Sequence, residues 1–391
     1  MVLKKLLYPL GLASMTMLQS YATPYIPSNG AEVLEHLPSR NDPAQQVLRR
    51  LRAELAIHPE NLPVAVDLVR LYITTWRDGG DPRYLGYAQA ALAPWWNLPD
   101  PPLAARVMRA TLLQSTHRFT AALADLDAVL RSDRNNAQAW LTRATVLTVL
   151  GEYAEAKKSC LQLSTLAPAL VTRTCLSSVE NLNGHAEKSY RELRQAFMTH
   201  PDADPGIKLW ILTLLAEMSL RLADTGAAQI YFQQALALGN PDNYLLAAYA
   251  DFLLGRHQPA QVVSLLKGKS QVDALLLRYA LALDALNAPD ADKVITQLQQ
   301  RFEAAKMRGD TIHQREQARF ELELMHNPRA ALRIAQENWS IQKEPADTLL
   351  LLNAAAAAGD RNAAQPVLAW IKKTGFEDRA LAAPIAQLGF K

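Results

Sequence analysis

The sequence of this 391-residue chain repeats at a period of 34 residues. Residues 103–136 align under 137–170, so that Arg109-Ala110-Thr111 falls on Arg143-Ala144-Thr145. A fixed period of about 20 to 50 residues is typical of proteins built from stacked copies of one small unit. The same frame recurs, with one or two residues missing in places, over 171–205, 209–242, 243–270, 311–344 and 345–378, and a degenerate copy fits 272–305.

The unit at 137–170 resembles the tetratricopeptide (TPR) repeat. It has Trp140 at position 4, the small residues Ala144 and Ala156 at positions 8 and 20, and Pro168 at position 32. The resemblance implies two antiparallel helices per unit that approach closely at the small residues. Proline ends the second helix because it lacks an N–H and clashes with the preceding turn. The resemblance predicts an all-α fold, a right-handed α-solenoid of stacked helix-turn-helix (TPR-like) repeats.

The frame also predicts where the two helices of the other units touch. The small residues that fill positions 8 and 20 are Ala110 and Ala122, Ala216 and Ala228, Ala318 and Ala330, and, in a unit whose first helix is about two residues short, Ala250 and Ala260. Composition agrees with helices, because only 16 residues are glycine while 49% are hydrophobic. A net charge of +3 excludes nucleic-acid binding driven by a strong basic field. Two cysteines exclude an iron–sulfur protein and an all-cysteine zinc site.

The first 22 residues have the layout of a secretory signal peptide, with Lys4 and Lys5, an apolar stretch, and Ser20-Tyr21-Ala22 at the cleavage site. An ordinary amphipathic first helix or a membrane anchor is the alternative. We expect a periplasmic or secreted protein, and the style of the sequence favours a Gram-negative periplasm. The remaining boundaries that we expect are a flexible segment over 23–43, divergent helical repeats over 44–102 with an insertion at Trp76–Pro82, the solenoid over 103–378 and a capping helix over 379–391.

No catalytic motif is present in the sequence. There is no G-x-S-x-G, no phosphate-binding glycine loop, no H-E-x-x-H and no C-x-x-C, and the eight histidines are scattered. We therefore predict a protein that is not an enzyme and that binds no cofactor or metal. The aromatic cluster of the N-terminal third can either anchor an interface or hold the insertion in place; it consists of Trp76, Tyr84, Tyr87, Trp95 and Trp96.

The two cysteines lie almost equally far on either side of the turn expected near Ala167–Pro168. In an antiparallel helix pair, Cys160 and Cys175 should therefore meet at the same height. Export would permit a disulfide there, which would add about 3 kcal/mol on the chain-entropy model. Two buried free thiols are the alternative.

In the resembled family, peptides bind a concave groove through positions 2, 5, 9 and 12 of each first helix. The candidate groove residues are Val107, Thr111, Gln114, Gln138, Leu141, Thr145, Thr148, Trp210, Thr213 and Glu217, with Ile312, Arg315 and Arg319 toward the C-terminus. The groove is polar in the middle of the chain, and it lacks the Lys/Arg/Asn set by which some relatives clamp a terminal carboxylate. We expect a protein-interaction scaffold. The alternative is a structural component of a cell-envelope export or polysaccharide secretion assembly.

Arg109 and Arg143 depart from the family pattern, in which position 7 is usually Leu. One interpretation is a stacked pair of guanidinium groups in the groove that offers bidentate donors to a ligand. The other is structural pairing with nearby acids such as Asp125, Asp127 or Glu180. The sequence leaves both open.

Overall fold

The computed structural model of the chain describes residues 29, 31 and 42–390. The predicted signal peptide, residues 1–22, lies outside the described residues, and so does nearly all of the predicted flexible segment 23–43. Residues 42–390 belong to one compact unit that spans Ser39–Lys391.

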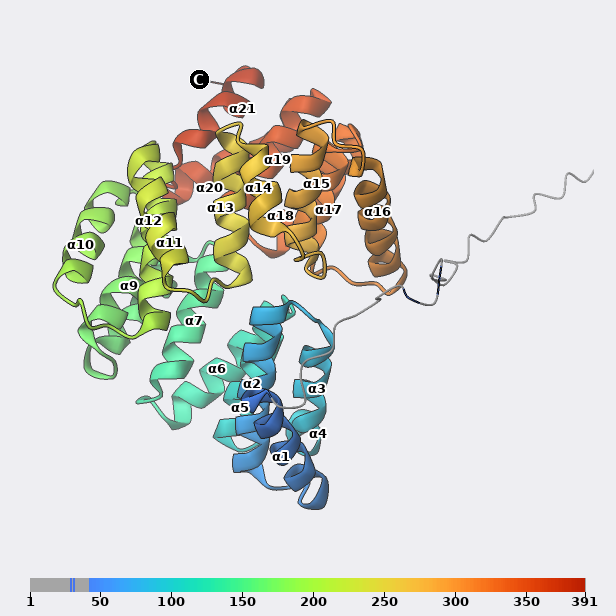
Figure 1. Cartoon of the computed structure of the whole chain (residues 1–391). Helices are drawn as coiled ribbons and strands as arrows, with labels where there is room; N and C mark the ends of the chain where they lie inside the picture. Colours follow the sequence, from blue (N-terminus) through green and yellow to red (C-terminus); the bar gives the residue numbers. More distant parts are fainter. Residues whose placement is uncertain (1–28, 30, 32–41, 391) are drawn as a thin grey trace, which may run out of the picture. The chain divides into compact units, whose positions relative to one another are not determined.

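The described residues contain α-helices and two short 3-10 turns but no strand, which confirms the all-α prediction (Figure 1). The helices of the first half are α1 (Pro43–Ile57), α2 (Leu62–Gly79), α3 (Arg83–Ala91), α4 (Ala93–Trp96), α5 (Leu103–Ser115), α6 (Phe119–Ser132), α7 (Ala137–Val149), α8 (Tyr153–Gln162), η1 (Leu163–Thr165), α9 (Ala169–Glu180), α10 (Ala186–Met198) and α11 (Pro205–Arg221). Those of the second half are α12 (Thr225–Ala237), α13 (Asn243–Gly255), α14 (Pro259–Leu266), α15 (Asp273–Ala285), α16 (Ala291–Met307), α17 (Gln314–Glu323), α18 (Pro328–Ile341), α19 (Pro345–Ala358), α20 (Arg361–Thr374), η2 (Arg379–Leu381) and α21 (Ala382–Gln387). Among these helices, none is long and apolar enough to cross a bilayer.

From α5 to α20 the helices form hairpins that share one kind of corner. Each corner places one residue in the left-handed backbone region; these residues are His117, Gly151, Gly184, Ala223, His257, Asn287, His326 and Gly359. In most of the corners the next N–H donates to the carbonyl five residues earlier, as from Glu152 to Leu147 at 2.8 Å. This bond satisfies a carbonyl that the end of a helix would otherwise leave without a donor. The corner therefore fixes how the two helices of each pair turn back on each other.

The predicted close contacts between paired helices are present. Ala110, Ala122, Ala156, Ala216 and Ala228 are fully buried, and Ala144 is 2% exposed. The two members of each pair lie twelve residues apart, seven before the corner residue and five after it. Small side chains at these two positions let the paired helices approach closely. These residues confirm the steric basis of the predicted solenoid.

Two of the predicted small positions are wrong by one or two residues. Ala260 is exposed, and Val262 takes the slot that packs against Ala250, because this corner has the same length as the others. Ala331 is buried in place of Ala330, which is only partly buried. The corner between α17 and α18 contains one extra residue, since the N–H of Asn327 donates to the carbonyl of Glu321, six residues earlier.

The N-terminal helices also differ from expectation in one place. Residues 76–79, expected within an insertion, continue α2, which ends where Gly80 adopts φ +71° and its N–H donates to the carbonyl of Trp76. Only the short turn Gly80–Pro82 separates α2 from α3. At the other end, η2 and α21 pack against α19 and bury Leu381 and Leu388.

Hairpins that are far apart in sequence contact one another. The side chain of Asn243 at the start of α13 donates to the carbonyl of Arg77 at 2.7 Å. Farther along the chain, the N–H of Lys343 donates to the carbonyl of Val149 at 2.7 Å. One apolar cluster includes residues of α7–α9 together with residues of α17–α21. The solenoid coils so tightly that successive turns of the superhelix touch, with α2 beneath α13 (Figure 1).

The contact between turns leaves no room for a side chain at Gly151. Its φ is +77°, and an added Cβ would lie 2.8 Å from Nε1 of Trp370. We expect Gly151→Ala to lower the free energy of unfolding by about 2–3 kcal/mol, from the left-handed backbone and the clash together. Urea unfolding measures this. Gly359→Ala is the matched control, because Gly359 has φ +67° and open space around its Cβ. It should cost about 1 kcal/mol, and equal losses in the two variants would contradict the packing of Trp370 on this corner.

Candidate functional site

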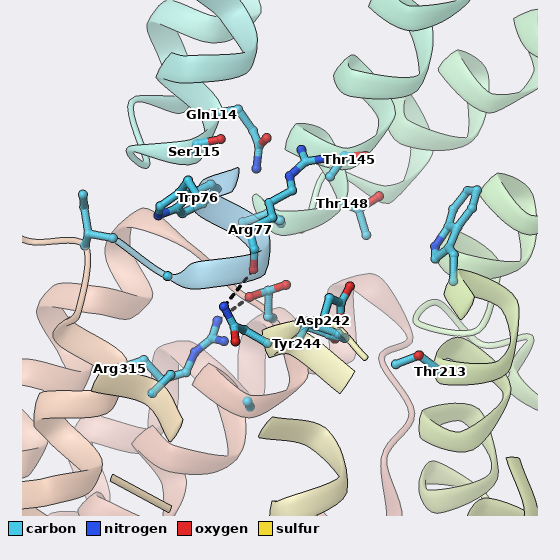
Figure 2. A pocket seen from close by; sticks show the side chains of 18 of the residues that line it. Trp76, Arg77, Gln114, Ser115, Thr145, Thr148, Thr213, Asp242, Tyr244 and Arg315 are labelled. Atoms are coloured by element: carbon cyan, nitrogen blue, oxygen red, sulfur yellow. Dashed lines mark hydrogen bonds and ion pairs between the residues drawn. The ribbon is translucent and has the colours of Figure 1, made fainter. Parts of the chain in front are cut away.

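The inner helices of the hairpins surround a cavity of about 980 Å³. Most of its wall comes from the first helices of the pairs, α2, α5, α7, α9, α11, α13, α15, α17 and α19. Leu85 of α3 and Ala305 of α16 also contribute, and Figure 2 shows part of the lining. A smaller hollow of about 540 Å³ is lined by α2, α5 and the start of α7. The larger cavity lies at the upper end of the range for ligand sites, about 300–1,000 Å³.

The two hollows adjoin along three helices. On α5, Thr111 lines the smaller hollow and Gln114, one turn later, lines the larger one. On α7, Gln138 lines the smaller hollow and Leu141 lines the larger one. Arg77 of α2 lines both hollows. Consecutive turns of a helix expose neighbouring side chains on one face. The hollows therefore form one continuous surface, which we call the inner groove.

Most of the candidate residues lie in this groove. Val107, Thr111 and Gln138 line the smaller hollow. The larger hollow is lined by Gln114, Leu141, Thr145, Thr148, Trp210, Thr213 and Glu217, and also by Ile312 and Arg315. Arg319 does not line either hollow, because its guanidinium pairs with Asp251 at 2.5 Å and with Glu323 at 2.9 Å. The structure brings these residues together, and their role in binding stays a prediction.

Arg109 does not face the groove. Its Nε and Nη2 donate to the two carboxylate oxygens of Asp125 at 2.7 and 2.6 Å, and its Nη1 donates to the carbonyl of Trp96 at 2.6 Å. Donating these hydrogen bonds to Asp125 raises the pKa of Arg109. This guanidinium joins α5 to α6 and holds the segment after α4.

Arg143 has the same function one hairpin later. Its Nε donates to Asp127 at 2.8 Å and its Nη1 donates to the hydroxyl of Ser159 at 2.8 Å. Glu180, the third acid considered, pairs with Lys157 instead. Of the two roles that the sequence leaves open, the structure gives Arg109 and Arg143 the pairing role, because their donors are occupied away from the groove.

Replacing these two arginines should therefore affect stability and leave binding intact. We expect Arg109→Met with Arg143→Met to lower the free energy of unfolding by about 2 kcal/mol, mainly because Asp125 is buried and loses its bidentate donor. Urea unfolding measures the loss. Under conditions where the double variant stays folded, it should capture a partner as well as the original chain does. Loss of capture by a fully folded variant would show that Arg109 and Arg143 take part in binding.

Cys160 at the end of α8 and Cys175 in α9 form a disulfide in the structure, with their Cα atoms 5.6 Å apart. Both residues are buried, and Cys175 also contributes to the wall of the larger hollow. The bond closes a loop with a sequence separation of 15 residues. It links two hairpins directly behind the middle of the inner groove.

The threonine hydroxyl groups of the groove donate hydrogen bonds to backbone carbonyls of their own helices. Thr145, Thr148 and Thr213 donate to the carbonyls of Leu141, Ala144 and Leu209 at 3.1, 2.8 and 2.8 Å. A hydroxyl that donates in this way keeps lone pairs that can accept. This wall of the groove therefore presents acceptors to a ligand that brings N–H donors.

Arg77 is one of several groove residues that the sequence analysis does not identify, together with Arg221, Asp242 and Tyr244. Figure 2 shows the side chain of Arg77 extending from α2 toward Gln114 and Thr145. Arg77 is exposed to solvent in the groove, but partial desolvation by the surrounding walls lowers its pKa, and the charges of Asp242 and Asp78 offset part of that effect. Positions 2, 5, 9 and 12 are defined only in units that fit the repeat, and the sequence of α2 does not fit it. The available signal was the aromatic cluster that includes Trp76, which also lines the larger hollow.

The side of the cavity formed by α11 and α13 is acidic. Glu217 accepts from the hydroxyl of Tyr244 at 2.6 Å, and burial raises the pKa of that carboxyl. Burial beside Glu217 also raises the pKa of Tyr244 well above its usual value. Asp242 accepts the N–H of Leu245 and so caps its own helix. Within residues 42–390, no group of His, Cys, Asp and Glu side chains is arranged to hold a metal ion.

The geometry of the paired helices identifies the architecture. Small residues meet at a spacing of twelve across the α5–α6, α7–α8 and α11–α12 hairpins, and the inner helices form one concave wall. The fold is a TPR-like α-solenoid.

Comparisons with known proteins find similarity among solved structures alone. A scan against family models finds no match, and a search of curated proteins finds none either. Among solved structures, a tetratricopeptide repeat protein from Parabacteroides merdae is similar at 16% identity and TM-score 0.42, covering 65% of this chain and 90% of that one. The Cut9–Hcn1 structure is similar at 15% identity and TM-score 0.43, with 81% and 60% covered. Human IFIT1 with m7Gppp-AAAA is similar at 17% identity and TM-score 0.44, with 90% and 86% covered.

Proposed function

We propose that the protein is an exported scaffold that binds an extended segment of a partner protein in its inner groove. The observation that carries the proposal is the continuity of the groove along consecutive turns of α2, α5 and α7. A preformed concave wall binds a chain segment at little ordering cost to the scaffold. The acceptor hydroxyls of Thr145, Thr148 and Thr213 suit the backbone N–H groups of such a segment.

Site-specific photo-crosslinking in the native cells tests this proposal. A photoreactive residue in place of Thr145, which is exposed in the groove, should form a covalent adduct with a partner protein. The matched control is the same residue in place of Ile230, which is 54% exposed on α12 and does not line either hollow. Mass spectrometry should map the adduct to one continuous segment of the partner. Equal crosslinking from both positions, or none from Thr145, would contradict binding in the groove.

Export is the second part of the proposal. The layout of residues 1–22 supports it, and so does the pairing of Cys160 with Cys175, since disulfides persist in oxidising compartments. After osmotic release of the periplasm, the protein should appear in the released fraction with an N-terminus at residue 23. Retention of Met1, or recovery with the cytoplasmic fraction, would overturn export without affecting the groove.

A further inference from the structure

We infer that the inner groove selects a partner segment that carries a carboxylate, and that this carboxylate pairs with Arg77 where the two hollows meet. The inference rests on the proposed function and adds the chemistry of the occupant. It uses three observations: a guanidinium without a partner, the distribution of charge around it, and the shape of the groove on both sides of it.

The first observation is that the donors of Arg77 are unused. Of the other arginines that line the larger hollow, Arg315 pairs with Glu344 and Asp347 and Arg221 donates to Asn181, whereas Arg308 has no side-chain partner within residues 42–390. The guanidinium of Arg77 makes neither a hydrogen bond nor an ion pair with any residue in the described part of the chain. A guanidinium presents five donors in a planar fork that matches a carboxylate. An Arg77 side chain that reaches into a hollow without such a partner is suited to receive one from a ligand.

The second observation is the distribution of charge. The smaller hollow is lined by Arg70 and Arg77 and by no acidic residue. Two acids act on Arg77 by their charge, Asp242 and Asp78. The carboxylate of Asp242 caps its own helix by accepting the N–H of Leu245 at 2.8 Å, and neither acid forms an ion pair with Arg77. The smaller hollow therefore adds no negative charge at the junction, where the guanidinium of Arg77 supplies a positive one. A ligand carboxylate placed there meets an opposite charge in a confined space, where the attraction is stronger than in bulk water.

The third observation favours a polypeptide over a compact ligand. The groove continues past Arg77 in both directions, from Val107 in the smaller hollow to Thr148 in the larger one. On the larger side the threonine oxygens can accept N–H donors, which a peptide backbone supplies at regular intervals. An extended segment with an acidic group would thus fill both hollows and satisfy Arg77 between them.

The test uses the full mature chain and three fluorescent octapeptide pools with otherwise randomised sequences. The first pool has a fixed internal Asp and blocked ends, the second has Asn in its place and blocked ends, and the third has Asn and a free C-terminal carboxylate. We expect the internal-Asp pool to bind about tenfold more tightly than the Asn pool by fluorescence anisotropy, because a charge-assisted bidentate pair is roughly twice as strong as a neutral hydrogen bond. The third pool reports whether a terminal carboxylate serves equally well.

Three variants locate the preference for a carboxylate. Arg77→Gln should bind the acidic and neutral pools equally, and Arg77→Lys should keep only part of the preference because it lacks the planar fork. Arg131→Gln, on the exposed end of α6, should behave like the original chain. Equal binding of all pools by the original chain, or a preference that survives in Arg77→Gln, overturns the role of Arg77 while peptide binding stands. Failure of every pool to bind overturns the proposed function and the inference with it.

Discussion

Asp347→Ala is expected to lower the free energy of unfolding by about 3–5 kcal/mol, because Arg315 keeps only Glu344 as a partner and several buried donors lose their acceptor. The side chain of Asp347 is fully buried at the start of α19. It accepts from Nε of Arg315 at 2.5 Å, from the amides of Asn338 and Gln342 at 2.7 and 3.3 Å, and from the N–H of Glu344 at 2.9 Å. Removing one carboxylate therefore leaves several buried donors without acceptors.

Urea unfolding of the variant at neutral pH measures this loss. Asp67→Ala is the matched control, since Asp67 is 62% exposed on α2 and forms only a surface pair with Arg70. It should change stability by less than about 0.5 kcal/mol. A loss below 1 kcal/mol for Asp347→Ala would show that the network around Arg315 relaxes and that this side of the groove is not rigid.

The second large effect concerns the disulfide. Replacing Cys160 and Cys175 together by Ala should lower the free energy of unfolding by about 3 kcal/mol, because a cross-link over 15 residues restricts the unfolded chain. A reductant should lower the stability of the original chain by a similar amount and should leave the double variant unchanged. Insensitivity of the original chain to the reductant, together with two thiols alkylated after unfolding, would show that the cysteines are free in the isolated protein.

The architecture was predictable because its cause is local. Paired alanines such as Ala144 and Ala156 report a close approach of two helices that are adjacent in sequence. The same reasoning placed the inner faces of α5, α7 and α11, and with them most of the groove. It failed at Ala330, because the sequence around the corner between α17 and α18 gives no sign of its extra residue.

The features that were missed depend on parts of the chain that are far apart. The position of Arg77 in the cavity follows from the approach of α2 to α13, 166 residues away, which the Asn243 hydrogen bond records. The pitch of the superhelix sets that approach, and no short motif encodes the pitch. The sequence leaves the roles of Arg109 and Arg143 open for a different reason. A guanidinium on an inner helix can turn toward the groove or toward Asp125 and Asp127, and only the folded structure shows which orientation it takes.

Contacts between successive turns change how this solenoid should respond to stress. In an ordinary repeat array each unit touches only its neighbours, so the ends can fray while the middle stays folded. Here the carbonyl of Val149 accepts the N–H of Lys343, and the corner at Gly151 packs against Trp370. The last hairpins therefore contact the middle of the chain directly. Melting should therefore be closer to all-or-none than stepwise, and shortening the array from its C-terminal end would remove support from hairpins that are nearly two hundred residues distant.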